Sequence, residues 1–347
     1  MKRPGHGCTQ PPYVVLRAAA LSLLAAVVAT LVGAILHAPV VLGADAGSPV
    51  RVGILGTSTP RSSPLIGAIV QELERLGHVE GRNLTIDYRN ADDKPERLPG
   101  LARELVRLKP DVILTHGTME STIEAMKATK TIPIVFAHPV DPVRAGLVTS
   151  LAKPGGNVTG VTSLNADLGA KRLELITEMV PGVRRVAVLV SPDDPDSLLM
   201  VEAVESAARA RRIRLDLLEI RDPARLSDTI RNARSAGAGA LLVLGSPPLY
   251  RLSPPLAQLA LQYRVPAISA WRAFPEAGGL ASFGTDLVEM FQRAAGLVDR
   301  VLKGAKPAEM PVEQPTNFEL VINTRTARAL GLAIPSAVLL RADHIIE

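Results

Sequence analysis

Cysteine and aromatic residues are scarce in this 347-residue chain. Cys8 is the only cysteine, so an internal disulfide is excluded and packing alone must stabilise the fold. Phe, Trp and Tyr make up 3% of the residues, whereas 47% are hydrophobic, so aliphatic side chains build most of the core. At about 150 residues per domain, the length predicts two domains.

A large excess of either positive or negative charge is also missing. The formal net charge is +5, and residues 1–46 hold three basic side chains and one acidic one. The rest of the chain contains 36 basic and 33 acidic side chains. No block of Lys and Arg is interleaved with aromatic residues, so the sequence predicts no nucleic-acid partner.

Catalytic motifs are absent as well. The sequence contains no P-loop, no G-x-S-x-G and no H-E-x-x-H, and the turn at 53–57 lacks the G-x-G-x-x-G spacing. His116 and His138 follow neighbouring predicted strands, but no cysteine or suitably spaced carboxylate completes a metal site. These histidines bind a ligand, bind each other through water, or face solvent. We expect no metal, no cofactor and no enzymatic activity.

The first 46 residues have the pattern of an export signal. Lys2, Arg3 and Arg17 are followed within the segment by an apolar run at 18–36 and an A-x-A site at 44–46. We therefore expect cleavage after Ala46 and a periplasmic location. An alternative stays open, because the apolar run is also long enough to serve as an uncleaved anchor.

From residue 50 onward, short apolar runs alternate with amphipathic helical segments, which is typical of parallel βαβ units. Two similar series of strands are predicted. The first is 50–55, 84–88, 112–115, 134–136 and 158–161, and the second is 185–190, 214–220, 240–244, 267–269 and 280–282. The fold class is therefore α/β, with two doubly wound parallel-sheet lobes that face each other across a cleft.

The remaining C-terminal elements are expected to cross between the lobes. A helix at 286–302 returns to the first lobe, and a strand at 318–323 with a helix at 324–330 returns to the second. The predicted lobes are 50–162 plus 284–308, and 163–283 plus 309–347. Several crossings would form a multi-strand hinge that suits closure around a ligand.

The segment 131–161 is the most informative part of the sequence. A buried strand at 134–136 leads into a proline-rich elbow, a short helix and a Pro-Gly-Gly-Asn turn. Prolines hold His138 and Asp141 in extended conformations just after the strand, where α/β sheets bind ligands. Alternatively, the prolines and glycines merely shape a loop.

Hydroxyl side chains cluster where predicted strands end, and Ser58, Thr59, Thr118 and Ser246 are among them. Serine and threonine are preferred helix N-caps, and capping is one interpretation of this pattern. The other is that these hydroxyls and the adjacent helix N-termini bind a carboxylate.

Acidic and aromatic side chains at the same edge allow two interpretations. Asp286 begins a capping box, yet it also suits an ammonium group. Asp193 and Asp194 fit a turn and a helix cap. Trp271, together with Arg272, is the best candidate for stacking on a flat ligand or for binding its acid group.

Several segments resemble one known family in both sequence and order. They are LGHVEGRNLTIDYRNA at 76–91, PERLP at 95–99, IPIVFA at 132–137, DPVRAGLV at 141–148, PGGNVTGV at 154–161, AGGL at 277–280, LKGAKP at 302–307 and PTNFELVIN at 315–323. Together they resemble the ABC transporter substrate-binding protein family, which includes TrpX-type proteins that bind tryptophan or tyrosine. The resemblance runs from about residue 50 to the end of the chain.

The resemblance implies a periplasmic binding protein-like I fold that closes on a small polar solute, for example an amino acid or a related small acid. It implies a monomer that delivers the solute to an ABC permease and its ATPase in the inner membrane. The ligand contacts implied by it are Ser58, Thr59, Gly117, Thr118, Asp141, Asp194, Ser246 and Asp286. A different class of function, the ectodomain of a membrane-anchored sensor, stays open if the leader is retained.

Overall fold

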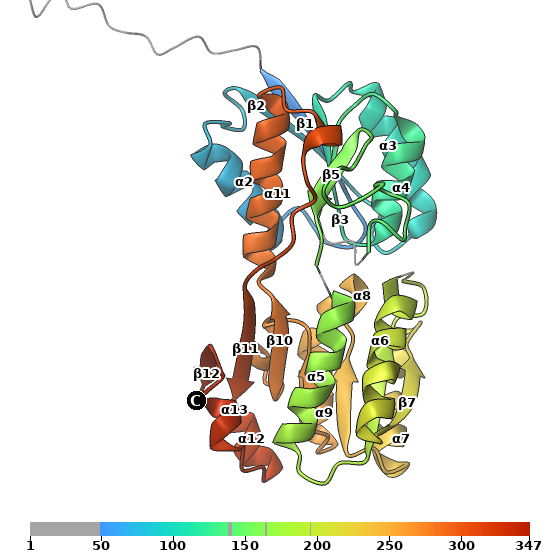
Figure 1. Ribbon diagram of the computed structural model, residues 1–347, viewed down its shortest axis with the longest axis vertical. Helices are drawn as coiled ribbons and strands as arrows, with labels where there is room; N and C mark the ends of the chain where they lie inside the picture. Colours follow the sequence, from blue (N-terminus) through green and yellow to red (C-terminus); the bar gives the residue numbers. More distant parts are fainter. Residues whose placement is uncertain (1–48, 138–140, 164, 195) are drawn as a thin grey trace, which may run out of the picture. The chain divides into compact units, whose positions relative to one another are not determined.

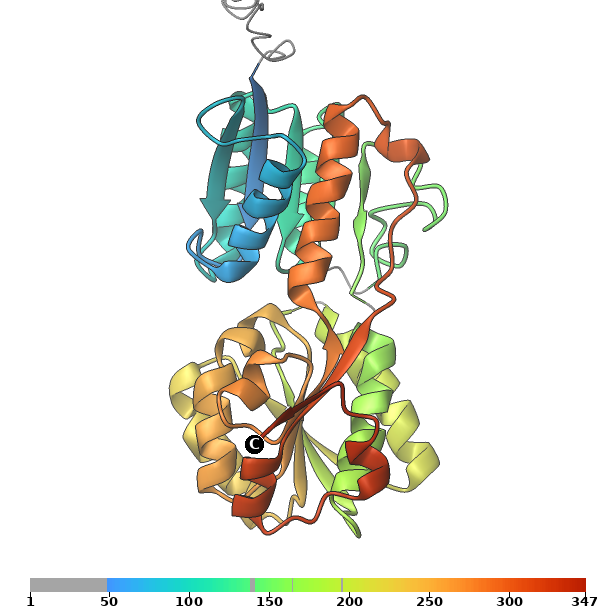
Figure 2. The same ribbon diagram turned by 90° about the vertical axis from the view of Figure 1, so that its left-hand side faces the viewer.

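A computed structural model describes residues 49–137, 141–163, 165–194 and 196–347 (Figure 1). The predicted signal segment, its cleavage site after Ala46 and His138 lie outside these residues. Two β-sheets organise the described chain, and each has helices on both faces (Figure 2). The sheet with its helices at the N-terminal side is called the first lobe, and the other is called the second lobe.

The first lobe is built on five parallel strands in the order β2-β1-β3-β4-β5. They are β1 (Val50–Gly56), β2 (Leu84–Asn90), β3 (Val112–His116), β4 (Ile134–Ala137) and β5 (Val158–Val161). Every residue of β3, β4 and β5 is buried, because helices cover both faces of the sheet. The helices are α2 (Pro64–Arg75), α3 (Leu98–Arg107), α4 (Met119–Ala128) and α11 (Leu287–Leu302), with short 3₁₀ turns at Pro95–Arg97 and Pro307–Glu309.

Two apolar cores lie on opposite faces of this sheet. One joins α2 and α11 to β1, and Phe291 and Val298 of α11 are buried in it. The other joins α3 and α4 to the opposite face and contains Phe136 and Leu105. A helix far along the sequence therefore completes the core of the first lobe.

The second lobe is built on seven strands in the order β12-β11-β10-β9-β8-β6-β7. They are β6 (Arg185–Val190), β7 (Arg214–Glu219), β8 (Ala240–Val243), β9 (Ala267–Ser269), β10 (Ala281–Thr285), β11 (Phe318–Asn323) and β12 (His344–Ile346). The helices are α5 (Asn165–Met179), α6 (Asp196–Arg211), α7 (Leu226–Ser235), α8 (Pro247–Arg251), α9 (Ser253–Gln262), α10 (Ala273–Glu276), α12 (Thr324–Leu330) and α13 (Ser336–Leu339), with a 3₁₀ turn at Pro223–Arg225. One continuous core joins these helices to the sheet.

Three segments connect the lobes and are held together by hydrogen bonds. The Thr162 amide donates to the Glu313 carbonyl at 3.0 Å, and the Glu313 amide donates to the Gly160 carbonyl at 2.8 Å. The Thr285 hydroxyl donates to the Ser163 carbonyl at 3.1 Å. The predicted α/β fold with two lobes and a multi-strand hinge is thus confirmed.

Two local predictions differ from the structure. Strand β11 is antiparallel to β10, because β10 ends at the hinge whereas β11 begins there on the return from the first lobe. The short helix expected after Asp141 is instead a series of turns. There the Asp141 carboxylate accepts hydrogen bonds from the amides of Val143 (3.2 Å) and Arg144 (2.9 Å), as a helix N-cap does. Gly146, with a φ of +69°, ends the turn before a helix can extend.

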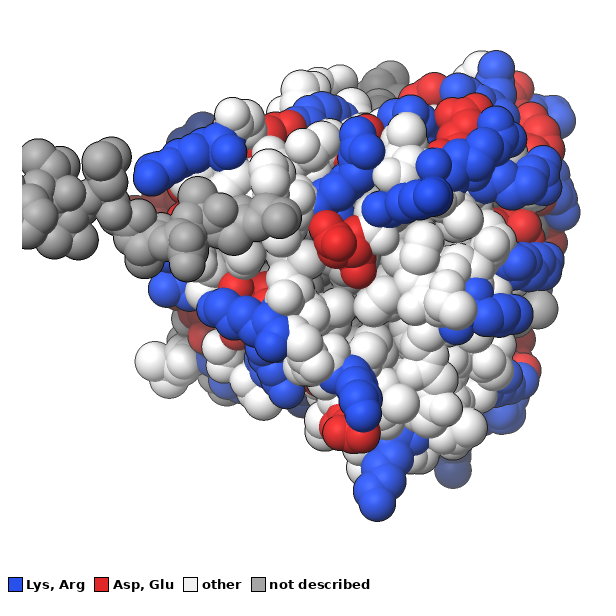
Figure 3. All heavy atoms as spheres, turned by 90° about the horizontal axis from the view of Figure 1, so that it is seen from above, with Lys and Arg blue, Asp and Glu red and all other residues white. Residues whose placement is uncertain are grey.

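Charged side chains of both signs lie on the surface. On the face shown in Figure 3, lysine and arginine side chains are interspersed with aspartate and glutamate side chains. This mixture agrees with the nearly balanced charge of the sequence beyond residue 46. Among the described residues, none of the helices combines the length and the apolar character that crossing a membrane requires.

Candidate functional site

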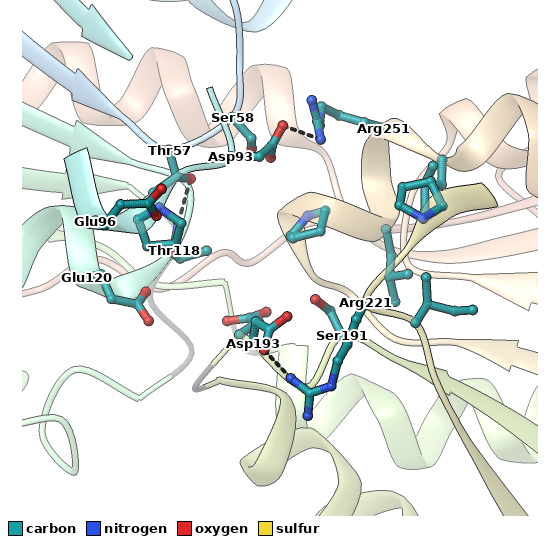
Figure 4. Close-up of a pocket in the computed structure, with 17 residues that line it drawn as sticks. Thr57, Ser58, Asp93, Glu96, Thr118, Glu120, Ser191, Asp193, Arg221 and Arg251 are labelled. Carbon is teal, nitrogen blue, oxygen red and sulfur yellow. Dashed lines mark hydrogen bonds and ion pairs between the residues drawn. The ribbon is translucent and has the colours of Figure 1, made fainter. Parts of the chain in front are cut away.

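The carboxyl ends of the parallel strands of both sheets border a cavity of about 460 Å³, here called the main cavity. Open α/β sheets bind their ligands at this edge. From the first lobe it is lined by Thr57, Ser58, Asp93, Pro95, Glu96, Thr118 and Glu120. From the second lobe it is lined by Ser191, Asp193, Asp194, Ile220, Arg221, Pro223, Pro248, Leu249, Arg251 and Leu252 (Figure 4).

A tight junction between two loops forms the wall of the first lobe. The Thr118 amide donates a hydrogen bond to the Thr57 hydroxyl at 3.2 Å. Gly117 has a φ of +93°, and a Cβ atom there would overlap that hydroxyl oxygen. Only glycine therefore allows the loop after β3 to approach the loop after β1. This approach places the Ser58 and Thr118 side chains on the cavity wall.

An ion pair joins the two lobes at one end of the main cavity. Asp93, after β2, pairs with Arg251 of α8 (Figure 4). Burial raises the pKa of Asp93 although the Arg251 charge acts in the opposite direction. Both side chains remain about a third or more exposed, at 34% and 43%, so solvent weakens the attraction.

Asp194, from the second lobe, is enclosed in protein and is only 2% exposed. One carboxylate oxygen accepts from the Asp196 amide at 3.2 Å, and the other has no hydrogen-bond partner among the described residues. Burial, and then the nearby charges of Asp196 and Glu120, raise the pKa of Asp194 well above its ordinary value. A buried carboxylate in this state favours a proton or a cationic group.

The neighbours of Asp194 do not neutralise it. Asp193 forms an ion pair with Arg221, so that arginine is already engaged (Figure 4). Glu120, in the first turn of α4, is half-buried, and its Oε2 atom has no hydrogen-bond partner among the described residues. Glu120 and Asp193 approach the same end of the cavity (Figure 4).

A second and much smaller cavity, of about 30 Å³, lies between aromatic side chains and is here called the aromatic cavity. Trp271 meets Tyr250 edge to face, with their ring centroids 5.8 Å apart, and Phe291 completes the wall. Thr59 and Gly117 also line it. The aromatic cavity has room for a water molecule or two but not for a ring.

Tyr88 and His116 support the loop after β1, which lines both cavities through Thr57 and Ser58 on one side and Thr59 on the other. The Tyr88 hydroxyl donates to the Thr59 carbonyl, and the Tyr88 ring stacks on His116 at a centroid distance of 6.1 Å. Burial raises the pKa of Tyr88 above its ordinary value, so the hydroxyl keeps its proton and remains a donor. His116 is buried and also contacts Phe291, with their ring centroids 5.6 Å apart.

The ten residues predicted to bind ligand fall into four groups. Ser58, Thr118 and Asp194 line the main cavity, and Thr59, Gly117 and Trp271 line the aromatic cavity. Asp141, Ser246 and Asp286 line neither of these two cavities. His138 lies outside the described residues.

Helix capping accounts for some of the polar side chains. The Asp286 carboxylate accepts from the amides of Val288 (2.8 Å) and Glu289 (3.2 Å), so its capping role is confirmed. Thr118 and Ser246 occupy the N-cap positions of α4 and α8, but neither side chain makes a capping hydrogen bond. The hydroxyl of Thr118 is therefore not committed to its own helix.

Stacking of Trp271 on a ligand stays a prediction. In this structure the residue is 2% exposed and its ring lies edge-on to Tyr250. Arg272 forms ion pairs with Glu276 and Glu319 instead of reaching the main cavity.

The sequence analysis missed five charged residues of the main cavity, namely Asp93, Glu96, Glu120, Arg221 and Arg251. Asp93 and Arg221 follow β2 and β7 within a few residues, so the rule that ligands bind after strand ends would have found them. No group of three or more His, Cys, Asp or Glu side chains in the described ranges is placed to hold a metal ion.

Comparison with known proteins gives consistent results. A family model described as ABC transporter substrate binding protein matches residues 57–346. A tyrosine-binding protein of Clostridioides difficile (strain R20291) is 30% identical over 272 residues, which are 77% of this chain and 76% of that protein.

Two solved structures are similar over 86% of this chain and 100% of their own. One is a conserved domain protein from Vibrio cholerae O1 biovar El Tor, with a TM-score of 0.79 and 29% identity. The other is an ABC domain from Streptococcus pneumoniae in complex with L-Trp, with a TM-score of 0.78 and 27% identity.

Proposed function

Because the chain belongs to the family of ABC transporter substrate-binding proteins, we propose that it captures an aromatic amino acid in the main cavity. The observation that carries this proposal is a cavity of about 460 Å³ at the strand ends, lined by both lobes. Cavities of about 300–1,000 Å³ are usual for small ligands. The similarity to a tyrosine-binding protein and to a structure with bound L-Trp supports the aromatic class.

The main cavity offers a distinct surface to each part of such a solute. Ile220 and Leu249 are buried, and together with Leu252 they provide an apolar wall for the flat faces of a ring. Polar side chains, among them Ser58, Thr118 and Ser191, line the cavity beside this apolar wall and provide a polar end for the rest of the solute. An amphipathic solute therefore suits the cavity better than a sugar, which would need hydrogen bonds on every side.

The hinge provides a mechanism for capture. We propose that residues 50–162 with 284–308 move as one body, and 163–283 with 309–347 as the other. The solute contacts both lobes only when they are closed, so its differential affinity shifts the population to the closed form. The family consists of binding proteins, and no catalytic step is proposed.

The proposed context is an importer. The protein would be exported, cleaved after Ala46, and act as a periplasmic monomer that delivers its solute to an ABC permease and ATPase of the inner membrane. N-terminal sequencing of the exported protein tests the cleavage. A retained leader would instead favour a membrane-anchored sensor.

Thermal unfolding with a panel of solutes tests the binding function. Tryptophan, tyrosine and phenylalanine should raise the melting temperature, because a ligand at about 100 times its Kd adds roughly 2.7 kcal/mol to the free energy of unfolding. Glucose and glutamate serve as controls. If the aromatic amino acids leave the melting temperature unchanged, the proposed solute class is wrong.

A further inference from the structure

The proposed function leaves open which group of the solute is recognised, and the charges of the main cavity bear on this question. We propose that the cavity selects its solute by an ammonium group held between Glu120 of the first lobe and Asp194 of the second. A carboxylate on the solute is not required, so aromatic primary amines bind as well. This inference rests on the proposed function and specifies its chemistry.

Two carboxylates without ion-pair partners among the described residues carry the argument. Asp194 is 2% exposed, lines the cavity, and has one oxygen with no hydrogen-bond partner in the described ranges. Glu120 reaches the cavity from the opposite lobe, and its Oε2 atom likewise has no hydrogen-bond partner among the described residues. A buried charge is strongly unfavourable unless it is paired, so this arrangement suits a cation.

The charge balance of the cavity wall points the same way. Five acidic residues and two arginines line it, and each arginine is already paired with an aspartate. Glu96, Glu120 and Asp194 therefore have no ion-pair partner within the described part of the chain. A solute carboxylate would enter a wall of net negative charge whose two arginines are both committed.

Four positions of the cavity wall offer no free backbone N–H group to a carboxylate. Pro95, Pro223 and Pro248 line the cavity, and proline has no N–H group. The Thr118 amide, at the N-terminus of α4, already donates to the Thr57 hydroxyl at 3.2 Å. These four positions therefore supply no free N–H group to a solute carboxylate.

A primary ammonium group suits the two carboxylates, those of Glu120 and Asp194, that have no ion-pair partner among the described residues. It has three N–H donors, enough to serve Glu120, Asp194 and one further acceptor, for which the Ser191 hydroxyl on the same wall is available. Because its two anionic partners belong to different lobes, the ammonium bridges them only when the lobes are closed. Recognition and closure are then the same event.

Matched sets of three compounds test this inference on the wild-type protein by calorimetry. Tryptophan, tryptamine and indole-3-propionate share one ring, and tyrosine, tyramine and 3-(4-hydroxyphenyl)propionate share another. We expect the amines to bind within about tenfold of the amino acids. The two propionates should bind at least about 100-fold more weakly than the amino acids, because they leave the carboxylates of Glu120 and Asp194 unpaired.

Neutral variants locate the effect. Glu120→Gln and Asp194→Asn should each weaken tryptophan and tryptamine by a similar factor of about 10 to 100. Glu124→Gln, on the same helix but paired with Lys127, and Asp228→Asn, paired with Arg231, are matched controls that should bind as the wild type does.

The outcomes separate this inference from the proposed function. If the amino acids bind while the amines do not, or if both cavity variants bind normally, the ammonium inference is overturned and the proposed function stands. If the propionates bind more tightly than the amines, the site recognises a carboxylate instead. If none of the six compounds binds, both proposals fail.

Discussion

Replacing Asp194 by asparagine is expected to stabilise the ligand-free protein while it weakens binding of a cationic solute. The side chain keeps its shape, and an amide avoids the free energy that a buried, unpaired carboxylate costs. One oxygen of Asp194 accepts from the Asp196 amide, and an asparagine at this position can keep the hydrogen bond through its side-chain oxygen. The substitution therefore removes a charge and little else.

The expected magnitude follows from the environment of the carboxylate. Leaving a buried polar group without a partner costs about 1–3 kcal/mol. Each kcal/mol changes the melting temperature by about 2–4 °C in a protein of a few hundred residues, and the lower end applies here because the chain is long. We expect the ligand-free Asp194→Asn variant to melt about 2–6 °C above the wild type near pH 7.5.

The pH dependence gives the sign of the effect. The pKa of Asp194 is higher in the folded protein than in the unfolded chain, mainly through burial and then through Asp196 and Glu120. Its contribution to stability is therefore full below the unfolded pKa and is lost as the pH rises through the folded pKa. The advantage of the variant should appear at neutral pH and largely vanish near pH 4.

Differential scanning calorimetry of the ligand-free wild type and variant at both pH values measures this difference. Asp228→Asn, which removes an exposed carboxylate of the second lobe, is the control and should change the melting temperature little. A variant that is less stable than the wild type by the same amount at both pH values would refute the reasoning, because it would show that the carboxylate is satisfied in the folded state.

Two further predictions concern the walls of the main cavity. Gly117→Ala should destabilise the protein by more than about 2 kcal/mol and weaken binding, because its Cβ would meet Thr57. Gly77→Ala is the control, because Gly77 has a similar φ of +97° in open space and its replacement should cost only the free energy of a left-handed backbone, about 1–2 kcal/mol. Chemical denaturation compares the two variants, and equal losses of stability would contradict the close approach at Gly117. Arg251→Gln should weaken solute binding by up to about fivefold at low salt, because the pair with Asp93 is worth up to about 1 kcal/mol, and a difference that persists in about 1 M salt would argue against it.

The sequence was sufficient to predict the fold because parallel strands covered on both faces appear as short, nearly continuous apolar runs. The predicted strands at 112–115 and 185–190 differ from β3 and β6 by at most one residue. The direction of β11 could not be predicted from the sequence, because it depends on where the chain re-enters the second lobe and not on local residue preferences.

The site was predicted only in part. Ser58 and Thr118 were found because they follow strand ends. Glu120 was missed because an acidic side chain in the first turn of a helix is also what the helix dipole favours. Arg251 was missed because its partner, Asp93, belongs to the other lobe and is distant in the sequence.

The position of α11 has a consequence for synthesis. Its apolar face, which includes Phe291 and Val298, fills the core beside α2 and β1, so that side of the first sheet is only partly covered until residue 302 has left the ribosome. The part of the chain synthesised before that point therefore cannot complete the core between α2, α11 and β1, and we expect folding of the first lobe to be delayed. If the protein is exported as proposed, this delay would leave the chain more time to cross the membrane before the first lobe folds.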